Sequence, residues 1–297
     1  MAEPYQGFDR LDGAGRALAA VAVRPRGVVY VALVSAIALS WLALGLMAAR
    51  QAGVEPSGMF GPGAGLLALL PDVPLPQGLE RFFMLCLTPA SLEVGGAVRF
   101  AVLALMWLLM SVAMMLPSAV PMIRTYCEIA DTAAAKGEKT VHPLVLACGY
   151  LCAWVFASLV FAAASLAVGS ASGGLWPGPV GVVASAAALA LAGLYQFSGL
   201  KETCLKKCRD PFAILFARWS TELRTVFKLG LEQGAWCVGC CWALMLVMFA
   251  VGVMNVFWMA LLAVFAVVEK QVASRLPGRL AGAILLVWSA ALLVGSA

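Results

Sequence analysis

Residues 234–251 read GAWCVGCCWALMLVMFAV, a stretch without a single charged side chain. As a helix it would be about 27 Å long, close to the ~30 Å hydrocarbon core of a bilayer. Similar runs recur along nearly the whole chain, which is 63% hydrophobic and only 12% charged. A soluble domain is typically about 25% charged. The composition therefore predicts an all-α fold, a polytopic transmembrane helical bundle.

We expect seven spans in a single transmembrane domain, residues 28–297, after a cytoplasmic segment, residues 1–27. The expected spans are residues 28–49, 97–120, 143–168, 180–199, 234–251, 256–268 and 280–295. Residues 252–255 separate the fifth span from the sixth and predict a tight helical hairpin; one long bent helix is the alternative. The long polar segment before the first apolar run argues against a cleaved signal peptide.

The basic residues predict the orientation, because short cytoplasmic loops carry an excess of Lys and Arg. With the N-terminus inside, all but three of the 20 Lys and Arg residues fall in inner segments; the exceptions are Arg50, Arg81 and Arg99. Merging the fifth and sixth spans would move the basic residues after position 269 to the outside. The distribution therefore favours the hairpin and an N-in, C-out topology, with residues 51–96 as the one long outer loop.

Several function classes are excluded by the residue inventory. The net charge of +5 comes from loops beside the spans and not from a basic stripe, so we expect no nucleic-acid partner. The expected partner of the chain is the lipid bilayer itself. His142 is the single histidine, which excludes His-rich metal sites and Ser-His-Asp catalysis. No nucleotide-binding loop is present, so active pumping by this chain alone is not expected. We expect no catalytic residues, and a protein that is more a binder than an enzyme.

Sulfur is concentrated in the inner half of the expected bundle. Cys237, Cys241 and Met245 recur every four residues on one helical face, and the second and third spans bring further sulfur to the same depth. Thiolates and thioethers are soft ligands that select Cu(I). The predicted metal ligands are Cys237, Cys240, Cys241, Met245, Met110, Met114, Cys148 and Cys152, together with a loop pair, Cys204 and Cys208.

The loop pair lies in LKETCLKKCRDP, residues 200–211, where four basic residues surround the two cysteines. Nearby positive charge favours thiolates. We interpret the pair as a cytosol-facing capture site for a soft metal, for transport or delivery to a membrane or periplasmic protein partner. The alternative is an amphipathic surface helix with its lysines at the lipid headgroups.

Two other interpretations of the sulfurs remain open. Methionine fills gaps in cores and free cysteine behaves as a small buried hydrophobe, so the chain is alternatively a structural or assembly subunit. Cys237 and Cys240 also form a C-x-x-C pair, as in membrane thiol oxidoreductases. With the expected topology only Cys86 lies outside, so the thiols should stay reduced, which disfavours the oxidoreductase.

A few polar residues near the inner ends of the spans are candidate supports for the site. Tyr150, Tyr195 and Gln196 could support the ligands by hydrogen bonds to them. Glu269 and Lys270 are expected to form an ion pair at the membrane interface. Asn255 is expected to cap the hairpin turn.

Several blocks of the chain resemble a bacterial family of integral membrane proteins. The blocks are MWxxM at 106–110, AMMLPS at 113–118, Gly149-Tyr150 with Trp154, LKxxCLxxCRxP at 200–211, GCCW at 239–242, GVMN at 252–255 and Glu269-Lys270. The family is catalogued as predicted metal-binding membrane proteins of unknown function, and the resemblance covers roughly residues 100–270. It implies a bacterial inner-membrane protein that holds a metal through these Met and Cys positions.

Overall fold

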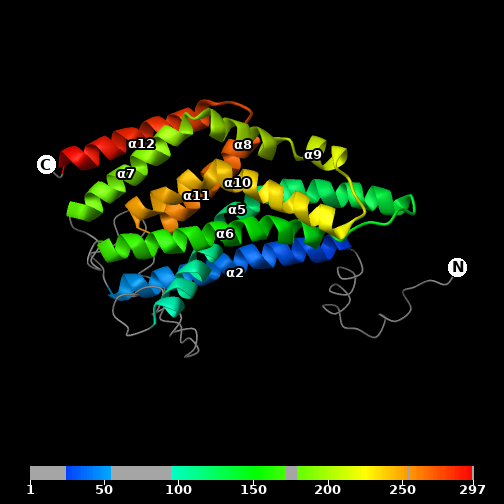
Figure 1. Cartoon of the computed structure of the whole chain (residues 1–297), viewed down its shortest axis with the longest axis horizontal. Coiled ribbons are helices and arrows are strands. Elements are labelled where there is room, and N and C mark those ends of the chain that lie inside the picture. Colours follow the sequence, from blue (N-terminus) through cyan, green and yellow to red (C-terminus); the bar gives the residue numbers. More distant parts are fainter. Residues whose placement is uncertain (1–24, 55–94, 172–178, 253–254, 296–297) are drawn as a thin grey trace.

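The computed structural model describes residues 25–54, 95–171, 179–252 and 255–295, and these residues form helices with no strand among them. The expected outer loop, with Cys86, lies outside the described residues. In chain order the helices are α2 (Pro25–Val54), α5 (Gly96–Ala135), α6 (Pro143–Ala171), α7 (Pro179–Gln196), α8 (Gly199–Arg209), α9 (Pro211–Ala217), α10 (Leu223–Val251), α11 (Val256–Gln271) and α12 (Leu276–Gly295). Most of the long helices lie side by side in one bundle (Figure 1).

Five of these helices, α2, α5, α6, α10 and α12, are long and apolar enough to cross a membrane. A sixth candidate is formed if α7 is counted together with α8, to which it is joined by a 65° bend. The expected all-α fold, with several helices long and apolar enough to span a membrane, is confirmed at this level. The expected sixth span is α11, whose sixteen residues make a helix of about 24 Å, shorter than the ~30 Å core. A count of seven and the N-in, C-out orientation stay predictions.

The hairpin between the fifth and sixth expected spans is present, and the single bent helix is not. α10 ends at Val251, and Gly252 follows with φ +95°, a backbone region that glycine enters at little cost. The Asn255 side chain caps α11 by accepting a hydrogen bond from the Trp258 backbone N–H at 3.3 Å. Lys270 then lies beside Cys237, with Nζ 3.0 Å from Sγ. One continuous helix would separate these two residues by about 50 Å.

α5 is longer than expected, because it continues past residue 120 to Ala135. Pro117 and Pro121 lie inside it. Proline lacks a backbone N–H, so Pro117 leaves the carbonyl of Ala113 without its helical donor. Trp41 of α2 supplies the missing hydrogen bond through Nε1, at 3.0 Å. The helix therefore persists through the prolines, and its charged last turns extend beyond the apolar bundle.

α6 and α10 pack with their backbones in contact. A Cβ atom added to Gly149, Gly230 or Gly234 would come within 2.2, 2.1 and 2.6 Å of the facing helix backbone. Small residues allow such approach between membrane helices, where packing replaces the hydrophobic driving force. The close approach brings Tyr150 of α6 to Cys237 of α10, with 3.0 Å between the hydroxyl and Sγ.

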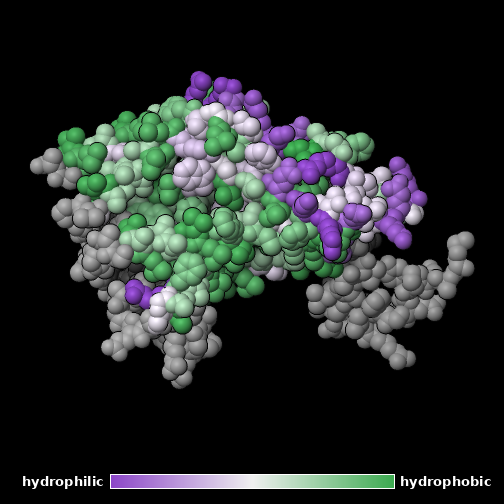
Figure 2. All heavy atoms as spheres, in the orientation of Figure 1, coloured by the Kyte–Doolittle hydropathy of each residue, from purple (hydrophilic) through white to green (hydrophobic). Residues whose placement is uncertain are grey.

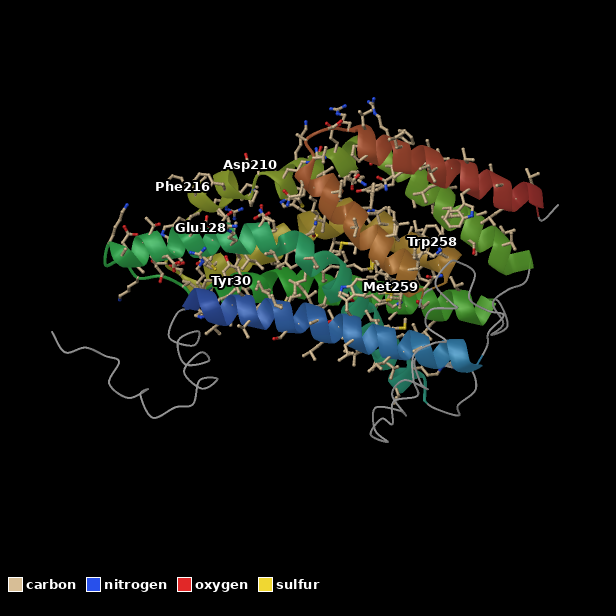
Figure 3. The ribbon with its side chains drawn as sticks, turned by 180° about the vertical axis from the view of Figure 1, so that it is seen from behind. Tyr30, Glu128, Asp210, Phe216, Trp258 and Met259 are labelled. Carbon is tan, nitrogen blue, oxygen red and sulfur yellow. The ribbon has the colours of Figure 1, made fainter. Side chains whose placement is uncertain are left out.

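Most polar atoms gather toward one end of the bundle, around α8, α9, the turn between α11 and α12 and the last turns of α5; a smaller polar patch lies at the start of α5, and most of the remaining coloured surface is apolar (Figure 2). Seen from behind, Glu128, Asp210 and Phe216 lie at this polar end, and Trp258 and Met259 lie farther along the bundle (Figure 3). The exposed aliphatic and aromatic side chains on the long helices, such as Leu39, Phe156 and Val287, suit contact with lipid.

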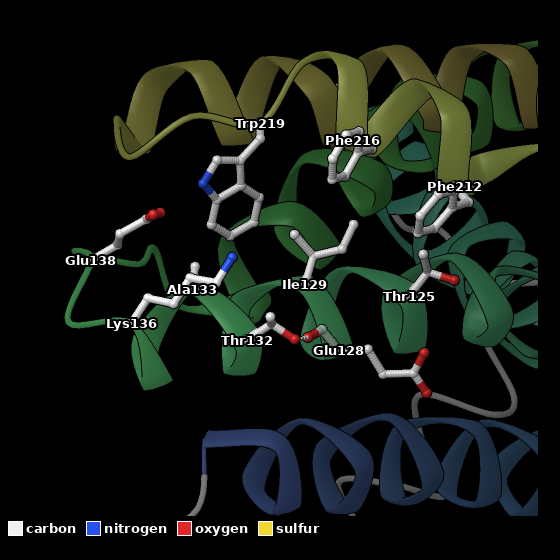
Figure 4. Close-up of a pocket in the computed structure, with 10 residues that line it drawn as sticks. All are labelled: Thr125, Glu128, Ile129, Thr132, Ala133, Lys136, Glu138, Phe212, Phe216 and Trp219. Carbon is white, nitrogen blue, oxygen red and sulfur yellow. Dashed lines mark hydrogen bonds between the residues drawn. The ribbon is translucent and has the colours of Figure 1, made fainter.

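A hollow lies at the polar end, between α9 and the last turns of α5. It has a volume of about 510 Å³ and is lined by Phe212, Phe216 and Trp219 on one side and by Ile129 and Thr132 on the other (Figure 4). No cysteine or methionine lines it. It is therefore not the place where sulfur ligands meet.

Candidate metal centre

Three thiols of α10 form a compact buried cluster. The Sγ atoms of Cys237, Cys240 and Cys241 all lie within 4.8 Å of one another, and the three side chains are at most 2% exposed. The Sγ atoms of Cys240 and Cys241 lie 3.3 Å apart. Spacings of three and four residues put side chains on one helical face. The GCCW block thus supplies a set of soft donors at a single point.

A fourth thiol reaches this cluster from α8. The Sγ of Cys208 lies 3.9 Å from the Sγ of Cys240. One turn earlier on the same face, Cys204 packs against α10 at Gly239, where an added Cβ would lie 2.8 Å from the Cys204 sulfur. Cys208 is half-buried, in contrast to the cluster. The loop pair and the GCCW block, more than 25 residues apart in sequence, are therefore parts of one site.

Four sulfur atoms from two helices thus meet here: three in the buried cluster and the Sγ of Cys208 within 3.9 Å of one of them. We call Cys208, Cys237, Cys240 and Cys241 the thiol centre.

The basic residues around the loop pair do not act on Cys204 as expected. The Lys201 ammonium is engaged by Glu269, with Nζ 2.8 Å from the carboxylate, and both side chains are 3% exposed. Arg209 donates to backbone carbonyls at the end of α11, including that of Glu269 at 2.7 Å. Burial raises the pKa of the Cys204 thiol. The prediction that neighbouring charge favours a thiolate is wrong for this residue.

Lys270 is the positive charge that faces the thiols. Its Nζ donates to Cys237 Sγ at 3.0 Å and to Ser118 Oγ at 2.6 Å. The expected ion pair between Glu269 and Lys270 is not formed, because Glu269 pairs with Lys201. An ammonium group in this position stabilises negative charge on the sulfur of Cys237.

Sequence reasoning missed Lys270 as part of the site, although a signal was available. Cys237 and Lys270 are equally far from the hairpin turn, fourteen residues each when counted from Val251 and Val256. Two antiparallel helices of equal rise bring such positions to the same depth. Accepting the hairpin therefore already implies that Lys270 is level with the first cysteine of the cluster.

The tyrosines expected as supporting groups make backbone and thiol contacts. The Tyr150 hydroxyl lies 3.0 Å from Cys237 Sγ and 3.2 Å from the carbonyl oxygen of Met115, to which it donates. The Tyr195 hydroxyl donates to the carbonyl of Gly239. Gln196 accepts a hydrogen bond from Lys201 through Oε1. Tyr150 contacts a thiol directly, and the other two groups hold the α7–α8–α10 junction.

The remaining predicted ligands divide into two groups. Cys148 and Cys152 are exposed. They flank Tyr150, and two residues along a helix is a rotation of about 200°, so they point away from Cys237. Met110, Met114 and Met245 are fully buried in the core, and no direct contact joins their sulfurs to the thiol centre among the described interactions. The structure therefore brings together Cys208, Cys237, Cys240 and Cys241, and separates Cys148 and Cys152 from them.

The donor chemistry of the thiol centre is that of a soft-metal site. The four groups are thiols, and cysteine sulfur selects Cu(I), zinc and iron–sulfur clusters. A Cu(I) ion held by two thiolates carries one net negative charge. The Lys270 ammonium, already at hydrogen-bond distance, offers the compensating positive charge that a buried anionic complex requires.

Comparison with known proteins identifies the family. No curated protein and no solved structure matches the chain. A family model described as PpoB2, copper chaperone, matches residues 104–292. This range begins close to the expected start of the resemblance near residue 100 and extends past residue 270 to include α12. It contains the whole thiol centre together with Ser118, Tyr150 and Lys270. Since the match covers well over half of the chain and includes every residue that builds the site, the protein belongs to the PpoB2 family of copper chaperones.

Proposed function

We propose that the protein is a multi-pass protein of the bacterial inner membrane that binds Cu(I) at the thiol centre and passes it to a membrane or periplasmic partner. Copper is the cargo of this reaction. The observation that carries the proposal is the meeting of Cys208 with the buried cluster, at 3.9 Å from Cys240. The half-buried thiol lies on the polar α8, and the other three lie inside the apolar bundle.

The arrangement supports entry of copper by ligand exchange. Cys208 takes the ion at the polar end, and Cys240 accepts it next because its sulfur is the nearest buried thiol. Cys237 and Cys241 lie within 4.8 Å and complete the transfer to the buried side. Cu(I) accepts two or three sulfur ligands readily, so each step replaces one copper–sulfur bond by another of the same kind.

Lys270 and Tyr150 hold the Cys237 thiol in place. Both groups lie 3.0 Å from Cys237 Sγ, and each is itself tied to α5, through Ser118 and Met115. Hydrogen bonds to a metal-binding sulfur orient the ligand and adjust its affinity.

The test is Cu(I) binding by the purified, reduced, full-length protein, measured by competition with a chromogenic Cu(I) chelator. The wild type should bind copper near stoichiometrically. Cys237→Ser/Cys241→Ser should lose most of it, because serine nearly preserves volume but replaces soft donors by hard ones. Insertion and folding should survive, at a cost of about 1–2 kcal/mol for each hydroxyl left unpaired.

The matched control is Cys148→Ser/Cys152→Ser, a second pair spaced by four residues whose side chains are exposed. This variant should bind copper like the wild type. Copper retained in the Cys237/Cys241 variant would contradict the assignment. A wild type that takes up no copper under reducing conditions would favour the structural subunit, in which the sulfurs only pack.

A further inference from the structure

Two pairs of contacts fix the relative depth of α5 and α10. Near the polar end, Lys270 bridges Cys237 of α10 to Ser118 of α5, at 3.0 and 2.6 Å. Farther along the bundle, the ring of Phe249 of α10 stacks on that of Trp107 of α5, with centroids 5.2 Å apart. The two segments between these anchors are about 18 Å long on α10 and about 17 Å on α5. The helices therefore run antiparallel in a constant register.

This register puts sulfur-bearing residues of the two helices at matching depths at successive turns. Cys241 is level with Met114, and Met245 is level with Met110. Met248 lies about one further turn along α10, directly before Phe249 of the Trp107–Phe249 stack. All five side chains are at most 1% exposed.

The helical faces also agree with this pairing. Met110 and Met114 lie three and seven residues after Trp107, which points toward α10, so they share its face of α5. Met245 and Met248 follow Cys237 by eight and eleven residues, which returns to the face that carries the thiols. The two rows thus lie on the faces of α5 and α10 that carry the contacts between these helices.

An aromatic cluster closes the far end of this row. Trp107 stacks between Phe161 and Phe249, at centroid distances of 4.8 and 5.2 Å. Its Nε1 donates to Ser165 Oγ at 2.9 Å, which fixes the ring. An ion that moved along the sulfurs from the thiol centre would therefore stop below Trp107.

We propose that Met110, Met114, Met245 and Met248 form a second soft-metal site, made of thioethers, which receives Cu(I) from the thiol centre. The proposal rests on the proposed function, since the thiol centre supplies the ion. Thioethers are neutral soft donors that bind Cu(I) without losing a proton. The ion keeps its charge and oxidation state: copper–thiolate bonds break and copper–thioether bonds form. The thiolates left behind retain the Lys270 ammonium and take up a proton in place of the metal.

The first experiment compares metal stoichiometry in the full-length reduced protein, titrated with Cu(I). The wild type should bind one ion at the thiol centre and a second, weaker one. The variant Met110→Leu/Met114→Leu/Met245→Leu/Met248→Leu conserves volume closely, so it should fold. It should keep the first ion and lose the second. The matched control Met47→Leu/Met122→Leu removes buried methionines from α2 and from α5 beyond Ser118, and should bind both ions.

The second experiment identifies the ligand atoms. Protein produced with selenomethionine carries selenium only at methionine, so copper X-ray absorption distinguishes Cu–Se from Cu–S scattering. Cu–S scattering alone is expected with one ion bound, and Cu–Se scattering should appear when the second is added. Absence of Cu–Se scattering at full loading, or its persistence in the quadruple leucine variant, would overturn the thioether site.

The two proposals fail in different ways. If the thioether site is wrong, the quadruple leucine variant binds as much copper as the wild type, while Cys237→Ser/Cys241→Ser still loses the tight ion. If the thiol centre is wrong, the cysteine variant keeps the tight ion, whatever the methionine variant does.

Discussion

At the scale of single residues, the charge balance around the thiols decides what the site can hold. The buried carboxylate of Glu269 is neutralised by Lys201 at 2.8 Å, with both side chains 3% exposed. The neighbouring Lys270 is thereby left to face sulfur, 3.0 Å from Cys237. A buried charge is tolerated when it is paired, and removing one partner is costly. Lys270 therefore suits a site that becomes anionic when two thiolates bind Cu(I).

Replacing Lys270 by Met should weaken Cu(I) binding by about tenfold or more, or about 1.4 kcal/mol. The physical reason is that the two-thiolate complex then has no counter-charge in a low-dielectric environment. The measurement is the Cu(I) dissociation constant by chelator competition.

Lys270→Arg keeps the charge and should bind more tightly than Lys270→Met. Lys206→Met, which changes an exposed lysine of α8 paired with Glu202 at 3.6 Å, should leave the constant unchanged. Equal affinity of Lys270→Met and the wild type would show that the ammonium does not compensate the complex.

At the scale of the helix, α8 presents two cysteines in different surroundings. Cys208 is half-buried beside Cys240, and Cys204 is 4% exposed against Gly239, with a pKa raised by burial. The thiolate is the form that alkylating reagents attack. At neutral pH both the accessibility and the thiolate fraction of Cys204 are therefore low.

A membrane-impermeant maleimide should accordingly label Cys208 faster than Cys204 in inverted vesicles. Single-cysteine comparisons, Cys204→Ser and Cys208→Ser, separate the two rates by mass spectrometry. Labelling of Cys204 should keep rising at a pH at which an ordinary thiol has already ionised, because its pKa is raised by burial. Cu(I) should protect Cys208. Faster labelling of Cys204 than of Cys208 would contradict the packing of α8 on α10.

Much of the architecture follows from the sequence because apolar length and charge position are local properties. The helices of the bundle and the break before Asn255 were predictable in this way. The continuation of α5 through Pro117 was not, because it depends on Trp41, a residue of another helix that satisfies the freed carbonyl of Ala113. Charged residues after position 120 ended the expected span, although they do not end the helix.

The site was predictable in part for the same reason. Cys237, Cys240 and Cys241 are neighbours on one helix, so their proximity follows from helical spacing. The contact of Cys208 with Cys240 depends on how α8 folds back on α10, which spacing does not contain. Cys148 and Cys152 have the same spacing as Cys237 and Cys241, but the rotation of α6 turns them outward. Periodicity identifies a face of a helix, but the neighbouring helices decide what that face meets.

At the scale of the whole molecule, the polar end formed by α8, α9 and the last turns of α5 (Figure 2) contains most of the basic loops. The positive-inside rule places such loops in the cytoplasm. The N-in, C-out prediction needs α11 to cross the membrane despite its length of about 24 Å, which local thinning of the bilayer would allow.

Reporter fusions test this topology. A fusion within residues 200–229 should report the cytoplasmic side, and a fusion at Ala297 the opposite side. A fusion after residue 139, in the turn between α5 and α6, serves as a control and should agree with the first. If fusions at residue 297 and within residues 200–229 both report the cytoplasm, α11 does not cross the membrane. The number of crossings is then even.

The backbone contact between α6 and α10 also has a mechanical consequence. At Gly149, Gly230 and Gly234 no side chain separates the two helices, with added Cβ atoms meeting backbone at 2.1–2.6 Å, so the pair moves as one rigid rod. Tyr150 and the cluster cysteines are mounted on that rod and keep their geometry while other parts move. α8 packs on this rod through Cys204 at Gly239, and it is also attached to α11 by the Lys201–Glu269 ion pair and by Arg209. Admission of an ion should therefore change the position of the Cys208 side chain and leave the geometry of Tyr150 and the cluster cysteines unchanged.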